Sequence, residues 1–90
     1  MGQIFVKDPE ATLDYQIDWS LWLDSTDRIT ASTWTVPSGL TKVSDTFTNT
    51  TTTIWLSGGT VGATYSVVNH ITTYLARQDD RTLEIVIEQK

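Results

Sequence analysis

Apolar and polar side chains alternate at almost every position between residues 13 and 23. The odd positions are all apolar, and the even positions are polar with the exception of one tryptophan. Because successive side chains of a β-strand point to opposite faces, this period predicts one long strand with a buried face and a solvated face. Tyr15, Ile17 and Trp19 are therefore predicted to lie in the core. A turn is predicted directly after the strand, at residues 24–27, where Asp, Ser and Thr side chains can bond to their own backbone.

The period of two recurs along the middle of the chain. Within residues 28–36 the apolar side chains move from odd positions to even positions. This change predicts either a bulge near Ser32 and Thr33 or a strand that crosses between two sheets. Residues 42–48 are mostly polar, which is typical of an edge strand. Residues 51–57 alternate again, so these last two segments together predict a hairpin.

Two further strands close the chain, with a polar turn predicted between them at residues 77–80. They supply the remaining predicted core positions, which are Tyr65, Val67, Ile71, Leu83 and Ile85. With a short apolar start at residues 4–6, the chain has about seven strands at spacings of about a dozen residues. This pattern predicts one all-β domain over residues 1–90, a small antiparallel sandwich of the immunoglobulin or fibronectin type.

Tyr65 carries a more specific signal for that architecture. It follows a glycine-rich corner and opens the second-to-last strand. In such sandwiches a tyrosine at this place hydrogen-bonds back to the preceding corner. The sequence is equally compatible with an ordinary core aromatic at this position.

Threonine is unusually common, with seventeen copies beside seven serines in a chain that is only 19% charged. Its β-branched side chain favours strands. Several threonines fall on strand positions that a free-standing domain more often covers with charge. A surface of hydroxyl groups favours packing against a neighbouring subunit.

The charge balance and the missing cysteines exclude several classes of function. A formal net charge of −5, with basic residues scattered from Lys7 to Lys90, argues against nucleic-acid binding. The chain has no cysteine, which removes disulfides, thiolate metal sites and thiol nucleophiles. No apolar stretch approaches the length of a membrane span, so no membrane partner is predicted.

The residues that often carry catalysis have simpler explanations here. His70 is the one imidazole and is predicted to face outward from its strand. Asp14 and Asp18 lie about 13 Å apart along a strand, which is too far for one metal ion or a retaining carboxylate pair. The glycines at 58–62 lack the Lys and the following helix of a phosphate-binding loop. We therefore predict no catalytic, cofactor-binding or metal-binding residues and no cofactor.

Three tryptophans lie at positions that do not follow the alternation of the neighbouring apolar residues, or lie near a break in it: Trp22, Trp34 and Trp55. An exposed indole marks either a platform for stacking sugars or a protein interface. Packing against the core or a sheet edge is the alternative for each of them. Binding is therefore the class of function that these residues indicate.

The order of four motifs between residues 8 and 88 resembles the fibre-tail adaptors, small structural proteins of tailed bacteriophages. The motifs are Asp-Tyr-x-Ile-Asp-Trp at 14–19, Ser-Thr-Trp-Thr-Val at 32–36, Trp-Leu-Ser-Gly-Gly at 55–59 and Asn-x-Ile-Thr-Thr at 69–73. The resemblance implies a non-enzymatic virion component in the tail or neck, which links fibres or other tail proteins to the particle. It also implies a ring of identical subunits, with other phage tail, neck or fibre proteins as partners.

We expect the interface to use the polar loops, the last turn and one tryptophan. The predicted interface residues are Trp22, Asp24, Asp27, Arg28, Gly58, Gly59, Arg77, Asp79, Asp80 and Arg81. The competing hypothesis is a carbohydrate-binding module, since acidic, threonine-rich sandwiches with exposed tryptophans also bind polysaccharides.

Overall fold

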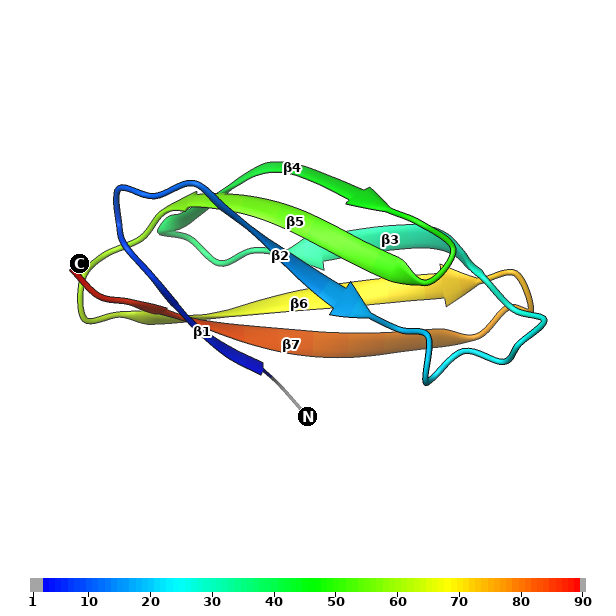
Figure 1. Cartoon of the computed structure of the whole chain (residues 1–90). Helices are drawn as coiled ribbons and strands as arrows, with labels where there is room; N and C mark the ends of the chain where they lie inside the picture. Colours follow the sequence, from blue (N-terminus) through cyan, green and yellow to red (C-terminus); the bar gives the residue numbers. More distant parts are fainter. Residues whose placement is uncertain (1–2, 90) are drawn as a thin grey trace.

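The computed structural model describes residues 3–89, which form seven β-strands and no helix. The strands are β1 (Gln3–Lys7), β2 (Leu13–Asp18), β3 (Ile29–Thr35), β4 (Leu40–Phe47), β5 (Thr51–Gly58), β6 (Thr64–Thr73) and β7 (Gln78–Ile87). They build two sheets with the orders β1-β7-β6-β3 and β2-β5-β4, which lie one over the other (Figure 1). The all-β sandwich predicted from the alternation is confirmed.

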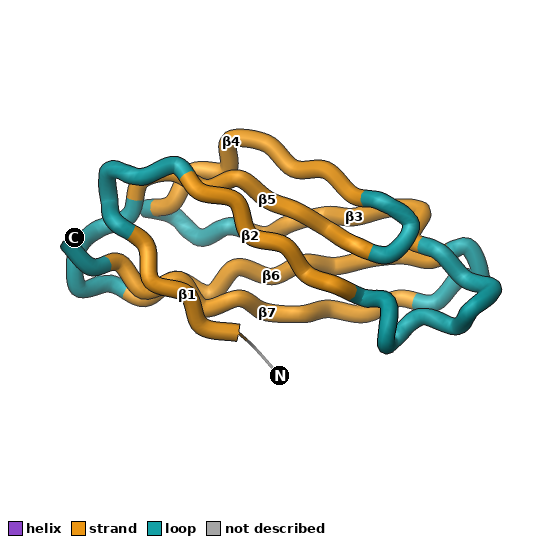
Figure 2. Tube along the Cα trace, viewed as in Figure 1, coloured by secondary structure: helices purple, strands orange, loops and turns teal. Residues whose placement is uncertain are grey.

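The sandwich is elongated, with extents of 43 × 23 × 19 Å. All connections between strands run at its two narrow ends (Figure 2). The β1–β2, β3–β4 and β5–β6 connections share one end, and the β2–β3, β4–β5 and β6–β7 connections share the other. Loops that follow each other in the sequence therefore lie at opposite ends.

Strand β1 departs from the predicted antiparallel pattern. It pairs in parallel with β7, with Phe5 opposite Ile85, whereas every other pair in the two sheets is antiparallel. The order β2-β5-β4 and the neighbours β3, β6 and β7 match the sheet partition of immunoglobulin constant-type domains. There the first strand joins the other sheet, so the immunoglobulin or fibronectin type stays a prediction.

The core between the sheets is formed by inward-facing side chains of both. Seven of the eight predicted core residues are buried: Tyr15, Ile17, Trp19, Val67, Ile71, Leu83 and Ile85. Tyr65 is partly buried and packs against this cluster. Ile29, Leu40, Ile54, Leu56 and Ile87 complete it.

The long strand predicted over residues 13–23 is wrong in its second half, because β2 ends at Asp18. The Asp18 carboxylate accepts a hydrogen bond from the backbone N–H of Ser20 at 2.9 Å, which turns the chain. A turn then follows, in which the N–H of Leu23 donates to the carbonyl of Trp19 at 3.0 Å. Leu21 is consequently fully exposed, although its parity predicted burial.

The predicted parity switch in β3 is present, but it lies earlier than expected. The register with β6 shifts between Ile29 and Ala31, not near Ser32 and Thr33, and the strand stays in one sheet. β4 is an edge strand in a hairpin with β5, as predicted. The last turn precedes the predicted residues 77–80, because β7 already begins at Gln78.

A buried polar cluster joins the two sheets near the end of β2. The Trp19 indole N–H donates to Thr52 Oγ1 of β5 and to Asn69 Oδ1 of β6, both at 3.2 Å. The Thr52 hydroxyl donates to the same Asn69 oxygen at 2.7 Å, and the Asn69 amide donates to Ser32 Oγ and the Thr33 carbonyl of β3. This network connects the two sheets through hydrogen bonds to the Trp19 indole, in a chain that has no disulfide to connect them.

Candidate interaction surfaces

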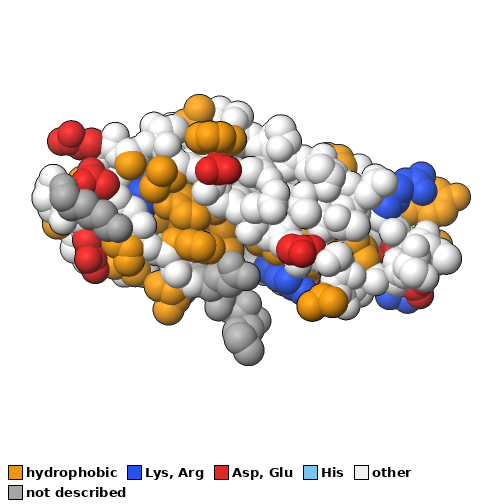
Figure 3. All heavy atoms as spheres, in the orientation of Figure 1, with side chains coloured by type: hydrophobic (Ala, Val, Ile, Leu, Met, Phe, Trp, Pro, Cys, Tyr) orange, Lys and Arg blue, Asp and Glu red, His pale blue; other side chains and the backbone are white. Residues whose placement is uncertain are grey.

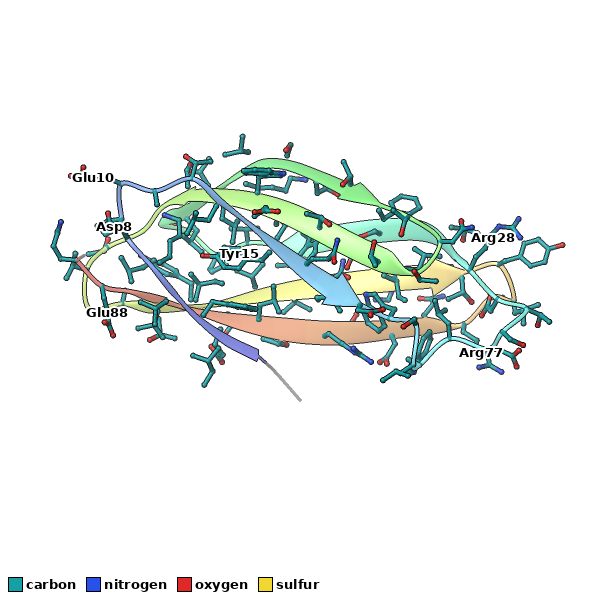
Figure 4. The ribbon with its side chains drawn as sticks, viewed as in Figure 1. Asp8, Glu10, Tyr15, Arg28, Arg77 and Glu88 are labelled. Carbon is teal, nitrogen blue, oxygen red and sulfur yellow. The ribbon has the colours of Figure 1, made fainter. Side chains whose placement is uncertain are left out.

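The two narrow ends of the sandwich carry different charges. Arg28 and Arg77 project at one end, whereas Asp8, Glu10 and Glu88 lie at the other (Figure 4). We call the first the arginine end, formed by the connections 19–28, 48–50 and 74–77, and the second the acidic end, formed by the connections 8–12, 36–39 and 59–63 with residues 88–89. In the space-filling view, blue and orange side chains meet at the right-hand tip, and red side chains gather at the left (Figure 3).

Asp27 organises the arginine end. Its carboxylate is buried and accepts hydrogen bonds from the backbone N–H groups of Arg28 at 2.9 Å and Leu75 at 3.0 Å. Burial acts to raise the pKa of Asp27, but hydrogen bonds from the Thr73 hydroxyl and the backbone groups of Leu75 and Arg28 outweigh burial and lower the pKa. The carboxylate thus links the β2–β3 loop to the β6–β7 turn.

The outer surface of the arginine end combines apolar side chains with cations. The Arg28 guanidinium lies 4.1 Å from the ring centroid of Tyr74, in cation–π geometry. Tyr74 is 59% exposed, Leu75 46% and Leu21 100%. Arg28, Tyr74 and Leu75 lie together, because Asp27 binds the backbone of both Arg28 and Leu75, and Tyr and Arg are enriched among the hot spots of protein interfaces.

The acidic end is held by a buried lysine. The Lys7 ammonium donates to the backbone carbonyls of Asp8 at 2.9 Å and Gly58 at 2.7 Å, which ties β1 to the end of β5. Desolvation lowers the pKa of Lys7, and the neighbouring Asp8 offsets part of this effect. Glu10 and Glu88 remain exposed on the outside.

The corner predicted at Tyr65 is also part of the acidic end. The Tyr65 hydroxyl accepts a hydrogen bond from the backbone N–H of Thr60 at 3.1 Å, so the predicted bond to the preceding corner is present. Gly39 has φ +105° and packs on this ring: a Cβ there would lie 2.7 Å from the Tyr65 hydroxyl oxygen. Glycine is therefore required at this turn for its conformation and for space.

The outer face of the β2-β5-β4 sheet presents one tryptophan. Trp55 is 41% exposed on the central strand β5, with Asp14 and Ser44 as its cross-strand neighbours. Trp22 and Trp34 are partly buried against the core, and Trp22 packs edge-on to Trp19 at 5.6 Å. Of the three tryptophans that the sequence left open, Trp55 is the exposed one.

His70 faces outward from β6, as the parity predicts, and both ring nitrogens are engaged. Nδ1 lies 2.5 Å from Asp80 Oδ1, and Nε2 lies 3.1 Å from Gln78 Oε1. Both partners present oxygen acceptors, so the ring donates to each when it is doubly protonated. The hydrogen bond to Asp80 is the main reason that the pKa of His70 is raised.

The structure divides the predicted interface residues among separate surfaces. Asp24, Asp27, Arg28 and Arg77 meet at the arginine end, but Gly58 and Gly59 belong to the acidic end. Asp79, Asp80 and Arg81 lie within β7, where Asp80 pairs with His70 and Arg81 stacks on Trp19 at 4.4 Å.

Trp22 packs inward, so it contributes less surface than Leu21, Tyr74 and Leu75, which the sequence analysis did not select. Tyr74 and Leu75 stand just before the predicted turn, and this position in the sequence could have indicated that they are exposed.

Residues 3–89 contain no pocket and no cluster of three or more His, Cys, Asp or Glu side chains placed to hold a metal ion. None of the described residues forms a helix long and apolar enough to cross a membrane. The surfaces available for interaction in this part of the chain are the two ends, the outer sheet faces and the strand edges.

A protein-family model matches residues 7–86 of the chain. The matching family is described as the podophage GP4 fiber-tail adaptor protein gp77. The chain belongs to this family. The resemblance seen in the four sequence motifs is thereby confirmed, over nearly the same residues. No curated protein matches the chain.

The family name describes a phage fibre-tail adaptor, a structural component of the virion tail. An adaptor of this kind binds other phage tail proteins. At the arginine end, the exposed Arg28 and Tyr74 are of residue types that are enriched at protein interfaces.

Proposed function

We propose that this protein is a non-enzymatic subunit of the podophage tail that joins tail fibres to the particle through protein–protein contacts, as one copy of a homo-oligomeric ring. The family match over residues 7–86 carries this proposal. It rests further on the sandwich itself, which holds two chemically different ends apart along its 43 Å axis. A subunit that contacts two neighbours at once needs two separated binding surfaces, and the two ends supply them.

The engagement of the single histidine supports the non-enzymatic part of the proposal. A general base needs an unprotonated nitrogen facing its substrate. In His70 one nitrogen is bound to Asp80 and the other to Gln78, and the raised pKa favours the protonated ring. The pair therefore acts as a cross-strand ion pair on the outer face of its sheet.

The composition of the strand faces supports assembly into a ring. Thr41, Ser44, Thr46 and Thr53 place hydroxyl groups around Trp55 on the β4 and β5 strands. Neutral hydroxyl groups carry a smaller desolvation cost than charges when a neighbouring copy covers them. Repetition around a symmetry axis then turns several weak contacts into a stable join.

The test is particle assembly in a phage that lacks the gene. Particles without the protein are expected to have heads and tails but no attached fibres in electron micrographs, and a plasmid copy of the gene restores the fibres. The double variant Arg28→Glu with Tyr74→Ala is expected to fail, because it removes the cation and the ring at the arginine end. Lys42→Glu, a charge reversal on the exposed edge strand β4, is the matched control. Normal fibres on particles without the protein would disprove the proposal.

Carbohydrate binding is the second candidate, and the exposed Trp55 ring favours it. An indole beside the Asp14 carboxylate and the Gln16 amide, which donates to Thr53 Oγ1 at 3.3 Å, can stack on a sugar while polar groups bond its hydroxyls. Binding would quench the fluorescence of the wild type and leave Trp55→Phe unchanged. No response to host surface glycans at about millimolar concentration would exclude this candidate.

A further inference from the structure

We infer that the arginine end of one copy docks on the acidic end of a second copy, so that copies associate head to tail. This inference rests on the proposed function, because it names a contact by which the subunits of the ring or connector meet. The complementary charges lie at opposite ends of the same chain (Figure 4).

The cation at the arginine end is prepared for an external partner. The two ion pairs among residues 3–89 are Lys42–Asp45 and His70–Asp80, so neither engages Arg28. The guanidinium is instead held over the Tyr74 ring, which fixes its position without neutralising its charge. A pre-positioned arginine loses less conformational freedom when it meets a carboxylate.

The aspartates of the arginine end do not cancel this charge. The Asp27 carboxylate is buried and turned toward the backbone N–H groups of Arg28 and Leu75. Asp24 is exposed, and Arg77 lies close enough to both aspartates to interact with them. Arg28, beside the exposed Tyr74 and Leu75, is therefore the cation left for a partner.

The acidic end offers the matching groups. Glu10 and Glu88 are exposed and take part in no ion pair within residues 3–89. The end also exposes an aliphatic side chain, Val61, at 53%. An arginine between apolar side chains on one copy thus faces carboxylates beside an apolar side chain on the next, which is a complementary arrangement.

The size of the ends limits the strength of the contact. The cross-section is 23 × 19 Å, which is smaller than the roughly 800 Å² per partner of a standard stable interface. The contact is therefore weak between two free copies. Because it joins two different surfaces, it produces a closed ring when the rotation between copies closes and an open chain when it does not.

Sedimentation velocity of the full chain tests this inference. Between about 10 μM and about 1 mM protein, we expect concentration-dependent association that high salt weakens. Arg28→Glu and Glu10→Arg, measured separately, should each weaken association about tenfold. An equimolar mixture of the two variants should associate again, because each supplies the intact end that the other lacks. Contact between two identical ends would not give this rescue.

Asp45→Lys is the control, because it reverses a charge in the middle of the edge strand β4, opposite Ile54 of β5. Circular dichroism verifies that all the variants are folded. A chain that stays monomeric over the whole range, an Arg28→Glu variant that associates like the wild type, or a mixture without rescue would overturn the inference. If particles that lack the protein still lose their fibres in that case, the proposed function stands and the head-to-tail contact alone is wrong.

Discussion

The arginine end and the acidic end are stabilised by different physical means. At the arginine end, buried polar side chains hold the loops: Asp27 binds the β6–β7 turn, and Trp19 anchors the start of the β2–β3 loop through Asn69. At the acidic end, the Lys7 ammonium and the Tyr65 hydroxyl also bind backbone groups, but the end additionally needs a left-handed backbone conformation at Gly39, under the Tyr65 ring. Leu21, which is fully exposed, and Tyr74, which is 59% exposed, belong to loops that side-chain hydrogen bonds hold. Such bonds fix the loops from inside and leave their outer surface free for a partner.

The largest expected effect is at the indole anchor. Asn69→Leu keeps the approximate volume of the side chain but removes one of the two acceptors of the Trp19 indole N–H, the acceptor of the Thr52 hydroxyl, and the donor to Ser32 and the Thr33 carbonyl. We expect the free energy of unfolding to fall by about 3 kcal/mol, measured by urea denaturation. Thr46→Val, on the exposed side of β4, should change it by less than about 0.5 kcal/mol. Equal stability of Asn69→Leu and the wild type would show that the network is dispensable.

Gly39→Ala tests whether the acidic end depends on backbone conformation. The new Cβ would clash with the Tyr65 ring at a positive φ, so we expect a loss of about 2 kcal/mol and a change in the near-ultraviolet circular dichroism of tyrosine. Gly62→Ala is the matched control: it has φ +89° but no atom within 4 Å of the new Cβ, so its loss should be about 1 kcal/mol. Identical losses would mean that the contact with Tyr65 has no role.

Asp27→Asn tests whether the negative charge of Asp27 stabilises the loops of the arginine end. The pKa of Asp27 is lowered in the folded state, so its ionisation stabilises the protein above the unfolded-state pKa, and this contribution is lost as the pH falls through the folded-state pKa. The variant should therefore lose less stability than the wild type between neutral and acid pH. Part of the acid sensitivity should remain, because the pKa values of Asp18 and Asp24 are also lowered. Parallel pH profiles of variant and wild type would contradict this role.

The smallest effect is expected at His70, on the strands between the two ends. Its raised pKa means that its pairing stabilises the fold fully below the unfolded-state pKa and ceases to do so as the pH rises through the folded-state pKa. In Asp80→Asn the pKa of His70 should move down toward 6.5, as followed by NMR titration of the imidazole protons. A titration that is unchanged in the variant would show that Asp80 is not the main cause of the shift.

The alternation of side chains predicted the sandwich and most of the core, because the sequence of each strand shows by itself which of its two faces is buried. The glycine-rich corner before Tyr65 predicted the hydrogen bond of its hydroxyl. It failed at Leu21, where the Asp18 carboxylate turns the chain although the apolar parity continues. The parallel pairing of β1 could not be predicted, because the alternation of side chains within a strand does not indicate which strand it pairs with or in which direction.

The interface hypothesis combined loops that the topology separates. In a sandwich built from successive antiparallel crossings, alternate connections fall at opposite ends, so Gly58 and Arg28 belong to different surfaces. The role of Asp27 was also beyond sequence reasoning. Its carboxylate binds Leu75, a residue 48 positions further along the chain, and that contact exists only once β6 and β7 are formed.

The parallel pairing of β1 with β7 also sets the order in which the protein can be completed during synthesis. Phe5 is translated 80 residues before Ile85, its neighbour in the sheet, so β1 must wait for β7 before it can pair. Contacts this distant in sequence are slow to form. Until they form, the edge of the nascent sheet stays open, and β1, with Phe5 packed on Tyr15, closes it only after β7 has been translated.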